Sequence, residues 1–195
     1  MILTQKFYER SPLKVAPEIL GKVLVRNISG QIISGRIVEV EAYIAFIDEA
    51  AHSFRGKTKA NYPLFGKAGV AYVHSIHMQQ CLDIVTEVED VPGSVLIRAL
   101  EPLEGIELMK QHRGKENLKD LTTGPGKLCK ALSITKEFNG VDVTNKESGL
   151  YFLDDGVSIP PKDLVVTKRI GLSKAADFEY RFCIKTSSYL SKRVS

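Results

Sequence analysis

Two glutamates stand at alternate positions of one apolar stretch, "GRIVEVEAY" (residues 35–43). Because side chains alternate between the two faces of a β-strand, Glu39, Glu41 and Tyr43 share one face, and the other face is apolar. A buried carboxylate is costly unless it is paired or hydrogen-bonded. The stretch is therefore either an edge strand with one solvated face or a strand that carries a functional acid. The alternation by itself favours the edge strand.

A second stretch, "VLIRALEP" (residues 95–102), is apolar on both faces except at Arg98. A buried guanidinium requires an acidic partner, and an adjacent cation lowers the pKa of a carboxylate. With the two strands close together, Arg98 would hold Glu41 ionised, and an ionised glutamate beside a pocket can orient and deprotonate a water molecule. A structural ion pair that only stabilises the fold explains the same pattern equally well.

Apolar periodicity and turn residues predict the elements that must position these side chains. Strands are predicted over residues 22–27, 31–44 and 94–102, in a hairpin over 70–86 with its tip near His77, and over 149–155, 163–172 and 180–186. Helices are predicted between Pro12 and Gly21, from Pro102 to Gly114, and over 127–134, with polar loops over 57–69 and 115–127. We expect an α+β fold: one mixed domain over residues 1–195 with a curled, largely antiparallel sheet and peripheral short helices.

Composition narrows the functional class only mildly. The chain has 27 basic and 23 acidic side chains, and a net charge of +4 permits contact with a polyanion without requiring it. We expect no membrane segment and no secretory signal, and a cytoplasmic location: near the nucleoid in a bacterium, or nuclear in a eukaryote. Three widely spaced cysteines predict buried free thiols in a reducing compartment, and two histidines in a strand-and-turn context predict no metal site.

Four motifs, two of which contain the stretches above, occur in order along the chain: "GRIVEVEAY…DEAAHS", "VLIRALEPLEG", "TGPGKLCKAL" and "KRIGL". Together they resemble the alkyladenine (3-methyladenine) DNA glycosylase family, of the type found in mammals and in many bacteria. The resemblance implies a monomeric enzyme without metal or cofactor that acts on double-stranded DNA. Its reaction is hydrolytic release of damaged purines (the class of 3-methyladenine, 7-methylguanine, hypoxanthine and ethenoadenine), which leaves an abasic site. Such an enzyme extrudes the target nucleotide into a pocket.

The resemblance also assigns the catalytic positions. Glu41 matches the general base of the family, Arg98 matches the arginine that helps to hold the water, and Ile170 falls where a main-chain carbonyl is the third water ligand. The chemistry agrees, because cleavage of a glycosidic bond builds oxocarbenium character on the sugar. One carboxylate beneath that sugar can stabilise the charge and activate the water.

Substrate-binding positions are carried over in the same way. Tyr43 and His52 match groups that stack on and contact the flipped base, and His74 falls where relatives commonly have a stacking tyrosine. Tyr72 is suited either to stacking on an electron-poor base or to cross-strand packing. Asp83 replaces a usual asparagine. Because an aspartate accepts hydrogen bonds without donating them, it would tolerate guanine-like lesions; the alternative is a surface aspartate that binds a turn. Neutral lesions need protonation, for which His52 is the candidate donor unless it is a packing histidine.

Duplex contact is predicted at the hairpin and at a basic loop. His77 falls at the residue that wedges into the minor groove, where it would be a weaker plug than tyrosine or simply an exposed turn residue. Lys127, in "GPGK", is the best candidate for a phosphate contact. Two alternatives stay open: a catalytically silent module of the same fold that binds damaged DNA, and a nucleoside N-ribohydrolase without a wedge.

Overall fold

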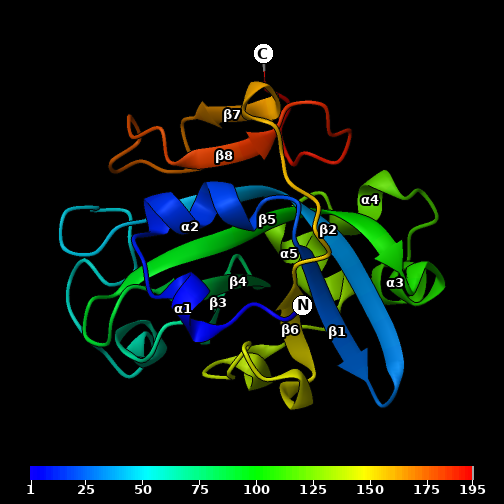
Figure 1. Cartoon of the computed structure of the whole chain (residues 1–195), viewed down its shortest axis with the longest axis horizontal. Helices are drawn as coiled ribbons and strands as arrows, with labels where there is room; N and C mark the ends of the chain where they lie inside the picture. The colour runs from blue at the N-terminus through cyan, green and yellow to red at the C-terminus, as the bar shows by residue number, and fades with distance from the viewer. Residues whose placement is uncertain (195) are drawn as a thin grey trace.

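The computed structural model describes residues 1–194. Within this range eight strands form one antiparallel sheet, in the order β3-β4-β5-β2-β1-β6, and β8 joins β2 and carries β7 at its outer side. Figure 1 shows β7 and β8 as a short two-stranded segment beside the long central strands. The strands are β1 (Val23–Ile28), β2 (Gln31–Tyr43), β3 (Ala71–Ile76), β4 (Gln79–Thr86), β5 (Gly93–Glu104), β6 (Leu150–Leu153), β7 (Leu164–Thr167) and β8 (Arg181–Ile184).

Short helices lie around this sheet, which confirms the predicted α+β architecture. They are α1 (Gln5–Tyr8), α2 (Pro12–Ile19), α3 (Ile106–Arg113), α4 (Lys119–Thr122) and α5 (Pro125–Ala131), with single 3-10 turns at Tyr62–Phe65, Lys136–Phe138, Lys146–Ser148 and Pro161–Asp163. The hydroxyl of Ser11 caps α2, which begins at Pro12, where a missing N–H does no harm. None of the helices in residues 1–194 is long and apolar enough to cross a lipid bilayer.

The main hydrophobic core joins these helices to alternate residues of the central strands. Val40 and Ala42 of β2, Val95 and Ile97 of β5, and Ile84 of β4 are completely buried in it. The neighbouring residues in each strand point to the opposite face. The three cysteines are buried and unpaired, as predicted.

The prediction of a helix opening at Pro102 is wrong. Strand β5 continues through Pro102 and ends at Glu104. Helix α3 begins only at Ile106, four residues after Pro102. Pro102 lies opposite Gly35 at a register shift of β2, where a missing N–H is tolerated. Gly105 makes the turn with a φ of 69°, and a Cβ there would lie 2.6 Å from the Ile32 carbonyl. Both predicted polar loops contain a helical segment: residues 57–69 include a 3-10 turn, and residues 115–127 include α4. Helix α5 begins at residue 125 rather than at the predicted residue 127.

Strand β2 is a central strand, so the edge-strand interpretation of its glutamates is wrong. It pairs with β5 along one side and with β1 and then β8 along the other, and Glu39 and Glu41 are both 0% exposed. The fold therefore encloses two acidic side chains, and the partners that make this tolerable define the candidate site.

Candidate active site

One row of residues crosses four strands of the sheet. Glu41 lies opposite Leu96 in β5, Leu96 lies opposite Asp83 in β4, and Asp83 lies opposite Tyr72 in β3. Directly opposite residues share a face, so the predicted base and two predicted substrate contacts, Asp83 and Tyr72, lie on one side of the sheet. This register brings together positions that are far apart in the sequence.

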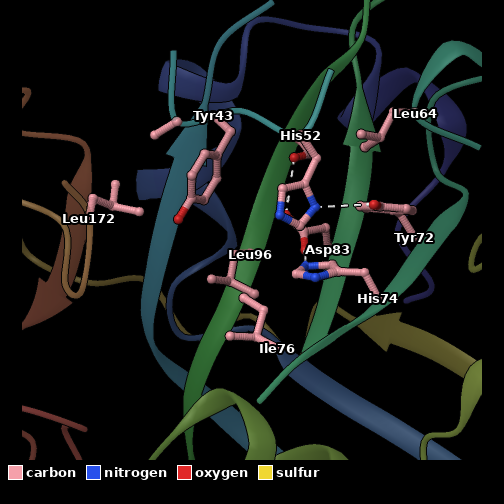
Figure 2. A pocket seen from close by; sticks show the side chains of 11 residues that line it. Tyr43, His52, Leu64, Tyr72, His74, Ile76, Asp83, Leu96 and Leu172 are labelled. Atoms are coloured by element: carbon pink, nitrogen blue, oxygen red, sulfur yellow. Dashed lines mark hydrogen bonds and ion pairs between the residues drawn. The ribbon is translucent and has the colours of Figure 1, made fainter. Parts of the chain in front are cut away.

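A cavity opens over this row (Figure 2). Tyrosine and histidine rings share its wall with aliphatic side chains, and the segment after β7 contributes one leucine. The lining residues are Tyr43, Ala50, His52, Leu64, Tyr72, His74, Ile76, Asp83, Ser94, Leu96 and Leu172. All five predicted substrate-binding residues are among them.

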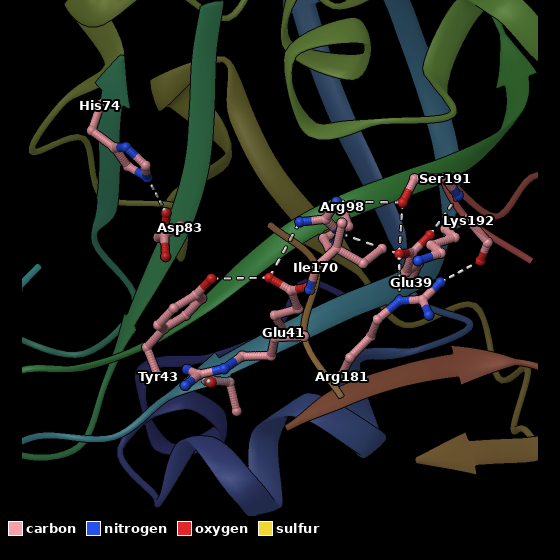
Figure 3. A network of polar contacts seen from close by, with 12 residues as sticks. Glu39, Glu41, Tyr43, His74, Asp83, Arg98, Ile170, Arg181, Ser191 and Lys192 are labelled. Atoms are coloured by element: carbon pink, nitrogen blue, oxygen red, sulfur yellow. Dashed lines mark hydrogen bonds and ion pairs between the residues drawn. The ribbon is translucent and has the colours of Figure 1, made fainter. Parts of the chain in front are cut away.

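Glu41 is fully hydrogen-bonded at the edge of this cavity. Its Oε2 accepts from the Tyr43 hydroxyl at 2.9 Å and from Nη1 of Arg98 at 3.2 Å, and its Oε1 accepts from the backbone N–H of Ile170 at 2.8 Å. Figure 3 shows the carboxylate between the Tyr43 and Arg98 side chains. Glu41 does not itself line the cavity, but its hydrogen-bond partner Tyr43 and its cross-strand partner Leu96 do.

The pKa of Glu41 differs from the sequence-based expectation. Burial raises it above its ordinary value, and the Arg98 cation, the Ile170 N–H and the Tyr43 hydroxyl lower it by less than burial raises it. Arg98 does act in the predicted direction. The net effect is a carboxyl group whose proton is lost at higher pH than in water, as suits a base that must accept one.

Glu39 shares Arg98 with Glu41, a role that was not predicted from the sequence. Its Oε1 accepts from Nε of Arg98 at 3.2 Å and from Nε of Arg181 at 2.8 Å, and Ser191 donates both its N–H and its hydroxyl to the same carboxylate. Two glutamates thus face two arginines, which balances the buried charge. A second glutamate on the same strand face was the sequence feature that could have predicted a second buried arginine.

A second buried ion pair, between Arg169 and Asp48, was not predicted from the sequence. Nη2 of Arg169 donates to Asp48 at 2.8 Å, and both side chains are 0% exposed. The guanidinium also donates to the Ala42 carbonyl at 3.0 Å and lies over the Tyr43 ring at 4.5 Å. Both charged residues occur in the motifs "DEAAHS" and "KRIGL". The pair ties the end of β2 to the segment that carries Ile170.

A cluster of packed rings forms part of the cavity wall. His74 stacks on Tyr72 with 5.0 Å between ring centroids, His52 meets His74 edge-on at 4.3 Å, and His52 Nδ1 lies 3.1 Å from the Tyr72 hydroxyl. Tyr72 therefore packs in the sheet and lines the cavity at once. Asp83 is buried on β4, so the surface-aspartate alternative is wrong.

His52 is a poor proton donor in this setting. Partial burial, and secondarily the neighbouring His74, lower the pKa of His52 below its ordinary value, while Asp83 opposes the shift. A lowered pKa leaves the imidazole mainly neutral near pH 7. Its hydrogen-bond partner is the Tyr72 hydroxyl, not the backbone contact of a packing histidine.

The remaining predicted positions lie outside the cavity wall. The atom of Ile170 that contacts Glu41 is the amide N–H, where the sequence predicted a role for the carbonyl. His77 and Met78 form the hairpin tip with φ values of 47° and 65°, and Met78 is 99% exposed. Lys127 lies in the seven-residue helix α5, where its Nζ donates to Thr123 at 3.3 Å. In residues 1–194 no group of three or more His, Cys, Asp or Glu side chains is arranged to hold a metal ion.

Comparison with known proteins places the sequence of this chain in a family. The family model of methylpurine-DNA glycosylase (MPG) matches residues 6–188. Proteins provisionally named 3-methyladenine DNA glycosylases are similar over 99% of this chain and 100% of their own length: 45% identical in Clostridium tetani, 44% in Clostridium perfringens and 43% in Methanoculleus marisnigri. The matched range includes all four motifs that suggested the resemblance, and the chain belongs to the methylpurine-DNA glycosylase family.

Proposed function

We propose that this protein is a monofunctional DNA glycosylase that hydrolyses the N-glycosidic bond of damaged purines in double-stranded DNA. The observation that carries the proposal is the buried Glu41 carboxylate, held by Arg98, Tyr43 and the Ile170 N–H at the edge of an aromatic cavity. The lesions are alkylated or deaminated purines of the 3-methyladenine, 7-methylguanine, hypoxanthine and ethenoadenine class. We infer one catalytic domain over residues 1–195, acting as a monomer on DNA inside the cell.

In the proposed reaction the flipped purine enters the cavity and lies against the rings of Tyr43, His52, Tyr72 and His74. Glu41 takes a proton from a water molecule, and the water oxygen bonds to C1′ of the sugar. The C1′–N9 bond breaks, and its electron pair leaves with the purine. The carboxylate also stabilises the cationic character that develops on the sugar, and Arg98 keeps it oriented. The products are a free base and an abasic site.

Water must reach Glu41 for this step, and in the structure Glu41 is 0% exposed. Leu172 lines the cavity two residues beyond Ile170, on the segment that contacts the carboxylate. We infer that entry of the nucleotide displaces Leu172, which opens a path between the cavity and Glu41. The same burial favours the second candidate function, a module that binds damaged DNA without turnover.

The duplex is proposed to lie against the hairpin tip. His77 and Met78 project from the sheet, and a groove beside the tip is lined by Met78, Gln79, Arg113, Gly126 and Lys130 among others. The groove therefore has cationic walls next to an apolar tip, a combination that suits phosphate contacts beside an inserted side chain. Lys127 extends the basic surface on α5, and binding should weaken steeply with salt.

The deciding experiment is base release from duplexes that carry single lesions. We expect release from 7-methylguanine and hypoxanthine duplexes, and a loss of about 100-fold or more in Glu41→Gln, which keeps the shape of the side chain and removes the base. Glu18→Gln, at a surface ion pair of α2, is the matched control and should behave as wild type. Tight binding to abasic DNA without release of any base would establish the silent module instead.

A further inference from the structure

His74 and Asp83 form a buried acid–imidazole pair in the cavity wall. Nε2 of His74 lies 2.8 Å from Oδ2 of Asp83, and the Ser94 hydroxyl donates to Oδ1 of the same carboxylate at 3.1 Å. Asp83 is 4% exposed, and the His74 side chain is 11% exposed. Because an ionised carboxylate only accepts hydrogen bonds, the hydrogen in this contact belongs to Nε2. Figures 2 and 3 show the pair on neighbouring strands, with His74 reaching toward Asp83.

The second ring nitrogen of His74 is unused. Nδ1 is buried and has no hydrogen-bond partner among residues 1–194. A buried polar atom without a partner is costly, so its position calls for an explanation. His74 lines the cavity, and a bound purine presents ring nitrogens of its own. A protonated Nδ1 would find there the acceptor that the protein does not supply.

Asp83 is the charged group in contact with this imidazole. The other groups around it are neutral near pH 7: burial raises the pKa of Tyr72, burial raises that of Cys81 (opposite His74 on β4) to about 12, and partial burial lowers that of His52. Farther along the sheet, Tyr43 is also a neutral phenol because burial raises its pKa. Glu41 and Arg98 form an ion pair with each other, so their charges offset one another. Asp83 therefore orients the His74 ring through a charge-assisted contact at 2.8 Å.

We propose that His74, oriented by Asp83, is the proton donor to the leaving base when the lesion is a neutral purine. The inference rests on the proposed glycosylase function and deepens it by naming a specificity-determining residue. An alkylated purine such as 7-methylguanine already carries a positive charge and leaves without help. A neutral purine such as hypoxanthine leaves readily only after it gains a proton.

The step balances as follows. Nδ1 of His74 gives its proton to a ring nitrogen of the purine, and the C1′–N9 electron pair departs with the protonated base. Water adds to C1′ and gives its proton to Glu41. The base leaves neutral, His74 is left neutral, and solvent returns a proton to His74 as Glu41 loses one. No group beyond the chain, the DNA and water takes part.

The sequence predicts a different role for Asp83, in which its carboxylate directly accepts a hydrogen bond from an exocyclic amine of a guanine-like lesion. The two roles make opposite predictions for Asp83→Asn. Loss of the direct acceptor would lower release of 7-methylguanine relative to hypoxanthine. Loss of the His74 partner would lower release of hypoxanthine relative to 7-methylguanine. The substrate ratio therefore separates them.

The experiment measures single-turnover release of both bases by wild type, His74→Gln and Asp83→Asn. Glutamine places an amide N–H near the Nε2 position, so Asp83 keeps a donor while the titratable ring is lost. We expect hypoxanthine release to fall by about 100-fold or more in His74→Gln, with 7-methylguanine release nearly unchanged. Glu18→Gln, at the surface ion pair of α2, is the control and should change neither rate.

Several outcomes would overturn the inference. Equal loss for both bases in His74→Gln, with normal thermal unfolding, would make His74 a general binding or structural residue. A wild-type enzyme that releases 7-methylguanine but no hypoxanthine would leave His74 without this role while the glycosylase proposal stands. Absence of any release by wild type would reject the glycosylase proposal itself.

Discussion

Glu39 and Glu41, two residues apart on β2, share the single guanidinium of Arg98, which donates to each at 3.2 Å. Nε serves the first carboxylate and Nη1 the second, so Arg98 bridges the structural pair formed by Glu39 with Arg181 and the proposed base. Lysine cannot reproduce this geometry, because an ammonium lacks the planar fork that reaches two carboxylates. The relationship makes Arg98 important for both stability and chemistry.

Replacement of Arg98 by glutamine should therefore strongly lower the free energy of unfolding. Two buried carboxylates lose a partner, and breaking a buried ion pair costs about 3–5 kcal/mol. Urea unfolding monitored by circular dichroism measures the change. The control is Arg10→Gln at the exposed pair with Glu18, where a loss of about 1 kcal/mol or less is expected. Similar losses in both variants would contradict the bridging role.

The acidic limb of the pH–rate profile should depend on Tyr43. Glu41 acts as a base only when ionised, so release of 7-methylguanine should fall as pH decreases through its raised pKa. The Tyr43 hydroxyl donates to the carboxylate and lowers that pKa. Tyr43→Phe removes this donor, so the pKa should rise further and the acidic limb should move to higher pH. Profiles of wild type and Tyr43→Phe test the sign, and Tyr62→Phe, at a half-exposed ring, should leave the limb in place. A limb that moves to lower pH would remove Glu41 as its source.

Local patterns predicted the parts of this site that lie along single strands. Alternation in residues 35–43 indicated which side chains share the face of Glu41, and the lone charge in the apolar run of residues 95–100 identified Arg98. Patterns did not predict Arg181, because its contact with Glu39 depends on β8 pairing with the second half of β2, 142 positions away. Nothing in the local sequence encodes that register.

The same reasoning explains the other misses. Asp48 and Arg169 meet across 121 positions through loops whose course depends on the whole sheet. Proline at position 102 is a helix-opening signal in most contexts, but here it falls opposite a register shift that accepts it within a strand. Propensity was overridden by tertiary pairing in this case.

Asp48 should be needed for activity although it lies behind the cavity wall. Its carboxylate neutralises Arg169, whose guanidinium lies against Tyr43 and whose neighbour Ile170 contacts Glu41. Asp48→Asn leaves a buried cation without its counter-ion, which should cost about 3 kcal/mol or more in stability and slow base release. Release of 7-methylguanine and thermal unfolding are the measurements. Glu49→Gln changes the adjacent, exposed acid and should alter neither, so equal behaviour of the two variants would contradict the assignment.

The hairpin tip should show opposite effects on stability and DNA binding. Met78 adopts a left-handed backbone conformation with φ 65°, which costs a non-glycine residue about 1–2 kcal/mol, and its side chain is 99% exposed. Met78→Gly should therefore stabilise the free protein by about 1 kcal/mol. The same change removes an apolar group that we propose contacts the opened duplex, so binding to lesion-containing DNA should weaken. Urea unfolding and fluorescence anisotropy on one preparation test both halves. Phe46→Gly, at another exposed residue with φ 66°, is the control: it should gain similar stability, and undiminished DNA binding in both variants would show that the tip does not insert.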